Sequence, residues 1–195
     1  MRGTFTEQAR GSQMVAAAIE VIADHGYAAA SMGRIAERIG VSRALLNYHF
    51  RNRRALIDAV VTEVYAAGYR AVRPGMDAEA TASGQLRAFI RGSVGFYQQS
   101  PQHIAALSEI IAGTQKGDFR PVTEHITTEL EALALLFRDG QRAGEFRDFD
   151  PYVMARSVRG ALDATLGARA ADPGLDLNHC GDELIVIFEN ATRAG

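Results

Sequence analysis

The sequence predicts an all-α protein, with an N-terminal helix-turn-helix followed by a larger helical domain and about nine helices in total. Apolar residues recur at three- and four-residue spacing along nearly the whole chain, and no segment shows sustained two-residue alternation. Glycine, proline and small polar residues divide this pattern into segments of helical length. These observations favour helices packed on helices and leave no candidate for a sheet.

Four helices are expected in the first third of the chain. The first covers roughly residues 10–25 and ends at Gly26, because glycine commonly terminates helices. The others each follow a residue whose side chain can cap a helix. Ser31 precedes a helix over roughly 32–39, Ser42 precedes one of about two turns, and Asn52 precedes one over roughly 53–70.

The remaining residues predict a connection and five further helices. The stretch "VRPGMDAEATASG", residues 72–84, is rich in Pro, Gly and small polar residues and is interpreted as a connection. Breakers such as Pro101, Pro121 and the "DPG" at 172–174 then separate the helical segments. Those helices are expected near residues 82–99, 101–113, 121–143, 151–171 and 178–193.

Composition limits the class of protein. The chain has 195 residues, 47% hydrophobic and 23% charged, which is typical of globular proteins. No apolar run reaches the ~18 residues that span a bilayer, and the first residues have no apolar signal core, so a cytoplasmic location is expected. The single Cys180 has no cysteine partner for a disulfide or a zinc site. No phosphate loop, acid pair or nucleophile motif is present, so we expect neither an enzyme, nor a cofactor, nor a metal site.

Charge is distributed unevenly along the chain. Residues 1–70 contain nine arginines and six acidic residues, a net charge of +3, whereas residues 71–195 carry a net charge of −5. A basic front and an acidic back suggest that only the front meets a polyanion.

The segment "IAERIGVSRALLNYHF", residues 35–50, has the pattern of a helix-turn-helix. Ala36 is small enough for the place where the helices cross, Gly40 suits the turn, and Val41 and Leu46 can fill the space between the helices. The second helix would then present its first residues to the DNA major groove. Arginine can bind a guanine edge and asparagine an adenine edge, while hydroxyl groups suit phosphate oxygens.

Over about residues 10–62 the sequence resembles the tetracycline-repressor (TetR) family of bacterial transcription regulators. The matching stretches are "DHGY", "IAERIGVS" and "YHFRNRRAL". The resemblance implies a DNA-binding domain over residues 1–52, a connecting helix over 53–70, and a ligand-binding and dimerisation domain over 71–195. Together with the hairpin pattern it indicates these DNA-binding residues: Ser31, Ser42, Arg43, Ala44, Asn47, Tyr48, His49, Arg51 and Arg53.

Several of these assignments have alternatives. His49 could donate to a phosphate, as the resemblance implies, or pack against the fourth helix. Arg51 and Arg53 could clamp the DNA backbone or form a solvated helix start. The family commonly has an aromatic residue where this chain has Asn47, which puts a phosphate-contacting tyrosine there in doubt.

In the C-terminal domain, candidates for an effector pocket come from apolar residues of the fifth to eighth helices, since such sites are mostly apolar with a few polar groups. The apolar candidates are Phe89, Phe96, Tyr97, Ile104, Leu107, Ile111, Leu133, Phe137 and Met154. The polar candidates are Gln98, His103, Glu109, Thr114, His125 and Arg156.

The last two helices are expected to form a dimer interface. "ELIVIF", residues 183–188, is apolar on most sides, and the preceding helix has a stripe of small residues that allows close approach. The alternative is that both are internal core helices of a monomer. Interface candidates are Val153, Ser157, Ala161, Ala164, Ala168, Leu184, Ile187, Phe188 and Ala191.

We therefore expect a homodimeric repressor whose partners are a palindromic double-stranded operator and a small, largely apolar effector, with no membrane partner. Two recognition helices ~34 Å apart can reach successive major grooves, which explains why a dimer is required. The alternative is a regulator of the same fold that acts without a ligand.

Overall fold

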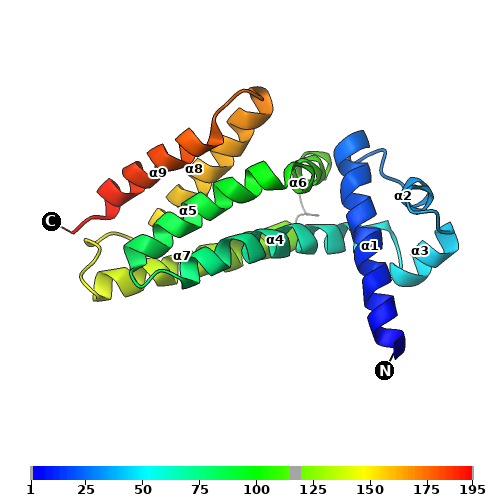
Figure 1. Ribbon diagram of the computed structural model, residues 1–195, viewed down its shortest axis with the longest axis horizontal. Helices are drawn as coiled ribbons and strands as arrows, with labels where there is room; N and C mark the ends of the chain where they lie inside the picture. The colour runs from blue at the N-terminus through cyan, green and yellow to red at the C-terminus, as the bar shows by residue number, and fades with distance from the viewer. Residues whose placement is uncertain (1, 115–119, 195) are drawn as a thin grey trace. The chain divides into compact units, whose positions relative to one another are not determined.

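The computed structural model describes residues 2–114 and 120–194, with side chains from residue 7 onward. In these ranges the chain forms nine helices and no β-strand, which confirms the predicted all-α fold (Figure 1). The chain divides into two compact units. The first unit is Met1–Ala66 with Ser100–Thr123, and the second unit is Ala67–Gln99 with Glu124–Gly195. Residues 100–114 and 120–123 thus lie in the first unit, and the domain limits expected from the sequence stay a prediction.

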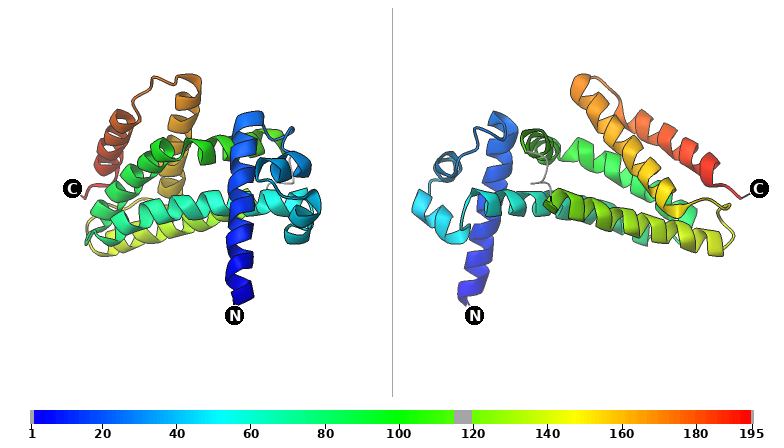
Figure 2. Two further views of the ribbon diagram at one scale, coloured as in Figure 1. Left: turned by 45° about the vertical axis from the view of Figure 1, so that its right-hand side comes forward. Right: turned by 180° about the vertical axis from the view of Figure 1, so that it is seen from behind.

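The first unit is built around α1 (Arg2–His25), which packs against α2 (Met32–Arg38) and α6 (Pro101–Gly113) (Figure 2). The short α3 (Arg43–His49) packs against α2. The unit also contains the first part of α4 (Arg53–Asp77) and the first residues of α7 (Arg120–Arg142). Its fully buried side chains include Met14, Ile22, Ile35, Leu46, Leu56 and Val60.

The second unit contains the rest of α4 and α7 together with α5 (Ala82–Gln99), α8 (Pro151–Ala171) and α9 (Leu177–Thr192). Its core takes apolar residues from α5, α7, α8 and α9, with Phe137 fully buried at 0% exposure. Among the described helices, none combines the length and the apolar character that crossing a membrane requires.

Helix α4 continues to Asp77, so most of the connection predicted over residues 72–84 is helical. It includes Pro74, which costs a helical hydrogen bond. Two features around the proline favour the helix nevertheless. Val72 and Met76 pack against the core of the second unit, and Arg73 forms an ion pair with Asp77 at 2.6 Å one turn later. Tertiary packing therefore outweighs the local breaker signal.

Helix α1 begins at Arg2, well before the expected start near residue 10. The residues before 10 carry no apolar periodicity, so the pattern could not reveal this first stretch of helix. Apart from α1 and α4, the helices begin and end within a few residues of their predicted limits.

Candidate nucleic-acid interface

Helices α2 and α3 form the predicted helix-turn-helix. Gly40 has a φ of 66°, a conformation that glycine adopts at little cost and other residues rarely adopt. Next to it, the Val41 N–H donates to the Ala36 carbonyl at 3.0 Å and closes the turn. Ala36 is only 2% exposed, as expected for a residue at the crossing of two helices. The hairpin is thus fixed by its local sequence.

Each helix of the hairpin begins at a serine cap. The Ser31 Oγ accepts a hydrogen bond from the Arg34 N–H at 3.2 Å, and the Ser42 Oγ accepts one from the Leu45 N–H at 3.1 Å. Such caps satisfy backbone donors that the helix itself leaves unpaired. A hydroxyl can also donate one hydrogen bond while it accepts another, so both serines retain a donor suited to a phosphate oxygen.

The outer face of α3 carries hydrogen-bonding side chains. Arg43, Ala44, Asn47 and Tyr48 are exposed, and Tyr48 reaches 76% exposure, while Leu46 is fully buried beneath them. Arg43 and Asn47 lie one helical turn apart and therefore share a face. This arrangement is typical of a helix that reads the edges of bases in a groove.

His49 at the end of α3 is half-buried, and its ring meets the Tyr48 ring edge-on with centroids 5.7 Å apart. This contact orients the exposed Tyr48 phenol. Both predicted roles of His49, phosphate donor and helix-end packing residue, are compatible with the contact.

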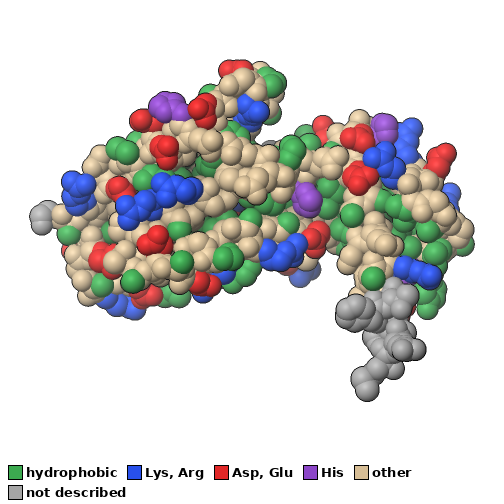
Figure 3. Space-filling model, viewed as in Figure 1, with side chains coloured by type: hydrophobic (Ala, Val, Ile, Leu, Met, Phe, Trp, Pro, Cys, Tyr) green, Lys and Arg blue, Asp and Glu red, His purple; other side chains and the backbone are tan. Residues whose placement is uncertain are grey.

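The arginines near the hairpin fall into two groups. In the space-filling view, basic and acidic side chains lie side by side on the first unit (Figure 3). Arg38 pairs with Glu20 at 2.8 Å and lies 3.6 Å from Asp24, so its charge is partly neutralised within the unit. Arg43 and Arg51, by contrast, are exposed and have no hydrogen-bond or ion-pair partner within the described residues. Their charges are available to an external anion.

Arg53 differs from the predicted phosphate clamp, because its guanidinium is bound inside the first unit. Its Nε donates to the Ala30 carbonyl at 2.9 Å, and its Nη2 donates to the Tyr27 carbonyl. The guanidinium also lies over the Tyr27 ring, 4.2 Å from the centroid. The Arg53 guanidinium is thus bound to two backbone carbonyls of its own unit, whereas Arg51 is exposed. Which of the two contacts the DNA backbone stays a prediction.

The predicted pocket residues are divided between the two units. Phe89, Leu133 and Phe137 are buried in the core of the second unit, and Tyr97 and Met154 pack against this core. Phe96 is also buried in that unit, close to Gly68. The other three, Ile104, Leu107 and Ile111, lie on α6 in the first unit. Their grouping as one pocket stays a prediction.

The second unit also contains a charged cluster that the sequence did not indicate. Arg159 on α8 contacts both carboxylate oxygens of Glu129 on α7 at 2.8 Å, and its Nε donates to Asp163 at 3.0 Å. Burial opposes the charged form of Arg159, but Glu129, Tyr97 and Asp163 outweigh it, and the pKa of the guanidinium is raised. The cluster is only partly buried, because Asp163 is exposed while Arg159 and Glu129 are mostly covered.

The outward faces of α8 and α9 carry most of the predicted dimer residues. Val153 and Ile187 are 61% and 53% exposed, and Ser157, Ala164 and Ala168 are exposed as well. Ala161, Leu184 and Ala191 are half-buried. Phe188 differs, because it is 7% exposed and belongs to the core of its own unit. The exposed Val186, at 52%, occupies the outward face of α9 in its place.

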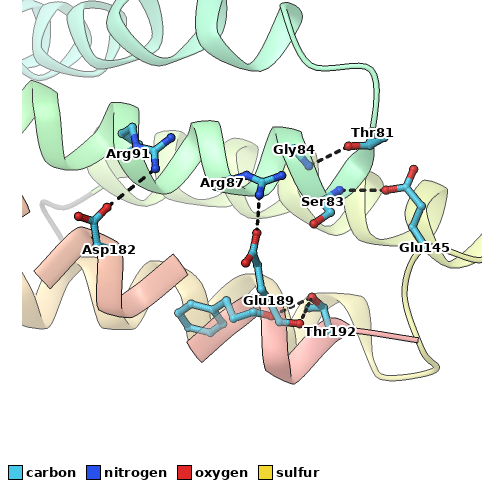
Figure 4. A network of polar contacts seen from close by, with 10 residues as sticks. Thr81, Ser83, Gly84, Arg87, Arg91, Glu145, Asp182, Glu189 and Thr192 are labelled. Carbon is cyan, nitrogen blue, oxygen red and sulfur yellow. Dashed lines mark hydrogen bonds and ion pairs between the residues drawn. The ribbon is translucent and has the colours of Figure 1, made fainter. Parts of the chain in front are cut away.

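Helix α9 is held on α5 by charged contacts and close packing (Figure 4). Arg87 pairs with Glu189 at 2.9 Å, and Arg91 lies 3.8 Å from Asp182. Near them, Gly181 allows Val94 to approach the α9 backbone. These contacts orient α9 so that Val186 and Ile187 face away from the unit's own core.

A serine-capped hairpin with a polar outer helix is the arrangement of a helix-turn-helix, the motif with which many proteins bind DNA. Residues 14–60 match the model for bacterial regulatory proteins of the tetR family. The tetracycline repressor protein class A from transposon 1721 of Escherichia coli is 28% identical over 132 residues, 68% of this chain and 56% of the repressor.

Solved structures show the same fold over nearly the whole chain. The transcriptional regulator FadR from Bacillus subtilis, in complex with stearoyl-CoA, superposes with a TM-score of 0.83 at 19% identity, covering 90% of this chain and 96% of FadR. A putative regulator from Saccharomonospora viridis, in complex with choline, gives 0.81 at 19% identity, with 95% and 98% coverage.

Over residues 14–60 the chain is thus similar to bacterial regulatory proteins of the tetR family, and over most of its length it has the fold of the solved regulators. It spans about half the length of the curated relatives it matches. Within the described residues, no group of three or more His, Cys, Asp or Glu side chains is placed to hold a metal ion.

Proposed function

We propose that this protein is a homodimeric repressor that binds a palindromic operator through α3 and leaves it when a small, largely apolar effector binds. The proposed DNA binding is supported above all by the outer face of α3, where Arg43 and Asn47 are exposed one turn apart. Exposed side chains of this kind match the base edges of a major groove. The proposal implies a cytoplasmic protein, since bacterial DNA lies there.

The dimer is supported by the outward faces of α8 and α9. Exposed apolar side chains such as Val153, Val186 and Ile187 lie beside small residues, a combination that favours close packing of helices from a second copy. One seven-residue recognition helix makes few base contacts, so two half-sites are needed for tight and specific binding. The same symmetry requires the operator to be palindromic.

The effector is proposed to enter the second unit. The core there is largely apolar, and the cluster of Arg159, Glu129 and Asp163 provides a few charged groups beside it. Apolar walls with a few polar groups are typical of small-molecule sites. The two structural neighbours were solved with quite different ligands, stearoyl-CoA and choline, so the fold by itself favours no single ligand class.

The experiment has two steps. First, binding to the DNA flanking the protein's own gene is measured by gel shift over a range of salt concentrations. Affinity should fall steeply with salt, because neutralised phosphates release counterions. An affinity that does not change with salt would refute the DNA-binding proposal in this form.

In the second step, a compound found in a thermal-shift screen is titrated by calorimetry with and without saturating operator. If the effector weakens operator binding by some factor, the operator must weaken effector binding by that same factor. A coupling of ~1–3 kcal/mol, or roughly 5–150-fold, is expected. Equal affinities in the two titrations would favour the alternative, a regulator of the same fold that acts without a ligand.

A further inference from the structure

Tyr27 lies where three elements of the first unit meet. It follows Gly26 in the connection between α1 and α2. Its N–H donates to the Glu109 Oε2 of α6 at 3.2 Å, and its carbonyl accepts from the Arg53 Nη2 of α4. Its ring lies beneath the Arg53 guanidinium, 4.2 Å from the centroid to Cζ. One residue of the connection is thus bound to both α4 and α6.

Two glycines allow this close fit. A Cβ added to Gly113 of α6 would overlap the Tyr27 ring, so the ring lies directly on the α6 backbone. Gly26 has a φ of 82°, and a Cβ there would lie 3.1 Å from the Glu109 carboxylate. Larger side chains at either position would push α6 or Tyr27 away.

Arg53 also joins the segments that precede and follow the hairpin. The hairpin runs from Met32 to His49, and the Arg53 Nε, at the start of α4, donates to the carbonyl of Ala30, just before α2, at 2.9 Å. A guanidinium can direct two donors to two separate carbonyls at once, which an ammonium group cannot do with the same fixed geometry. Hydrogen bonds from a charged donor are also stronger than neutral ones.

We propose that Arg53, Tyr27 and Glu109, here called the Tyr27 clamp, are positioning residues that hold the hairpin at the angle needed for operator binding, without touching DNA. This rests on the proposed DNA-binding function. The clamp assigns Arg53 a role different from the phosphate contact that its place in the basic segment predicts. It also makes α6 part of the support of the hairpin, although 82 residues separate Tyr27 from Glu109.

The slope of affinity against salt separates a positioning residue from a phosphate contact. Each lost phosphate contact lowers the slope of log affinity against log salt by about 1. Arg51→Ala, which removes an exposed and unpartnered arginine, should show this loss. Arg53→Met should lower the operator affinity about tenfold or more and leave the slope unchanged. A lower slope for Arg53→Met, equal to that of Arg51→Ala, would overturn the proposal.

A second set of variants tests the α6 side of the clamp, in which the two Glu109 variants remove the same charge and differ only in the hydrogen-bond acceptor. Glu109→Ala removes the acceptor of the Tyr27 N–H, whereas Glu109→Gln retains an oxygen that can accept it. Tyr27→Phe keeps the ring and the backbone groups and is the matched control. Glu109→Ala should lower the affinity for operator relative to random DNA and speed hydrogen exchange at the Tyr27 amide. Glu109→Gln and Tyr27→Phe should stay close to wild type in both.

Circular dichroism at the assay temperature shows whether each variant is folded. If Arg53→Met does not fold, the salt dependence of Arg53→Lys and the comparison of Glu109→Ala with Glu109→Gln test whether the Tyr27 clamp positions the hairpin. A folded Glu109→Ala with wild-type operator preference would overturn the proposal. A wild-type protein that shows no preference for operator over random DNA would instead refute the proposed function. The exchange rate of the Tyr27 amide would then still report whether the clamp exists.

Discussion

Replacing Arg43 by alanine should lower operator affinity without lowering the stability of the fold. The side chain is exposed and has no hydrogen-bond or ion-pair partner within the described residues, so its removal breaks no contact in the free protein. A bidentate contact between arginine and guanine discriminates by ~1–3 kcal/mol against other bases. A symmetric dimer has two such contacts, which gives a total of about 2–6 kcal/mol, or roughly 30-fold to 10⁴-fold in affinity.

The spacing on α3 also predicts the arrangement of the bases. Asn47 lies four residues after Arg43, which is ~6 Å along the helix axis. Successive base pairs are ~3.4 Å apart, so the guanine read by Arg43 and the adenine read by Asn47 should be about one or two steps apart in each half-site.

The assay is a selection from random DNA with the wild-type protein, Arg43→Ala and Asn47→Ala, followed by affinity measurements on the selected sites. Each variant should lose the base preference at one position of each half-site and keep the other. Arg51→Ala should keep the whole motif and bind all sequences more weakly. Identical motifs for wild type and Arg43→Ala would show that Arg43 does not read a base.

Two further predictions concern the second unit. Ala164→Arg, on the exposed face of α8, should give monomers in sedimentation and weaken operator binding. The control Ala132→Arg, at an exposed position of α7, should remain dimeric. A dimeric Ala164→Arg would show that the interface lies elsewhere. Arg159→Met should lower the free energy of unfolding by about 1–3 kcal/mol, because it leaves Glu129 partly buried without its partner. The double variant with Glu129→Leu should recover most of the lost free energy of unfolding, as measured by chemical denaturation. If Arg159→Met alone is as stable as wild type, the reasoning is contradicted.

The hairpin could be predicted from the sequence in detail because its determinants are local. Ser31 and Ser42 cap helices that begin at the next residue, Gly40 takes the positive φ that the turn requires, and Leu46 is fully buried at its expected place. Each of these depends on neighbours within about one turn of helix. The helix limits elsewhere follow similarly from breakers and periodicity.

Other features depended on partners distant in the chain. Helix α4 continues through Pro74 because Val72 and Met76 pack against the core of the second unit. Nothing in residues 72–84 themselves indicates this packing. Similarly, Phe188 belongs to an apolar segment that could face a partner or its own core, and packing within the second unit decides for the core.

The sequence by itself determined the helical class, the hairpin and the residues Arg43 and Asn47 on its outer face, since a repeating apolar pattern shows which side of a helix is buried. Only the tertiary structure decided what each charged side chain binds. Arg51 and Arg53 look equivalent in "RNRR", yet one is exposed and the other is bound to Tyr27 and Ala30. A side chain's partner is set by which backbone groups the fold brings within about 3 Å of it, and that proximity is not encoded in local spacing.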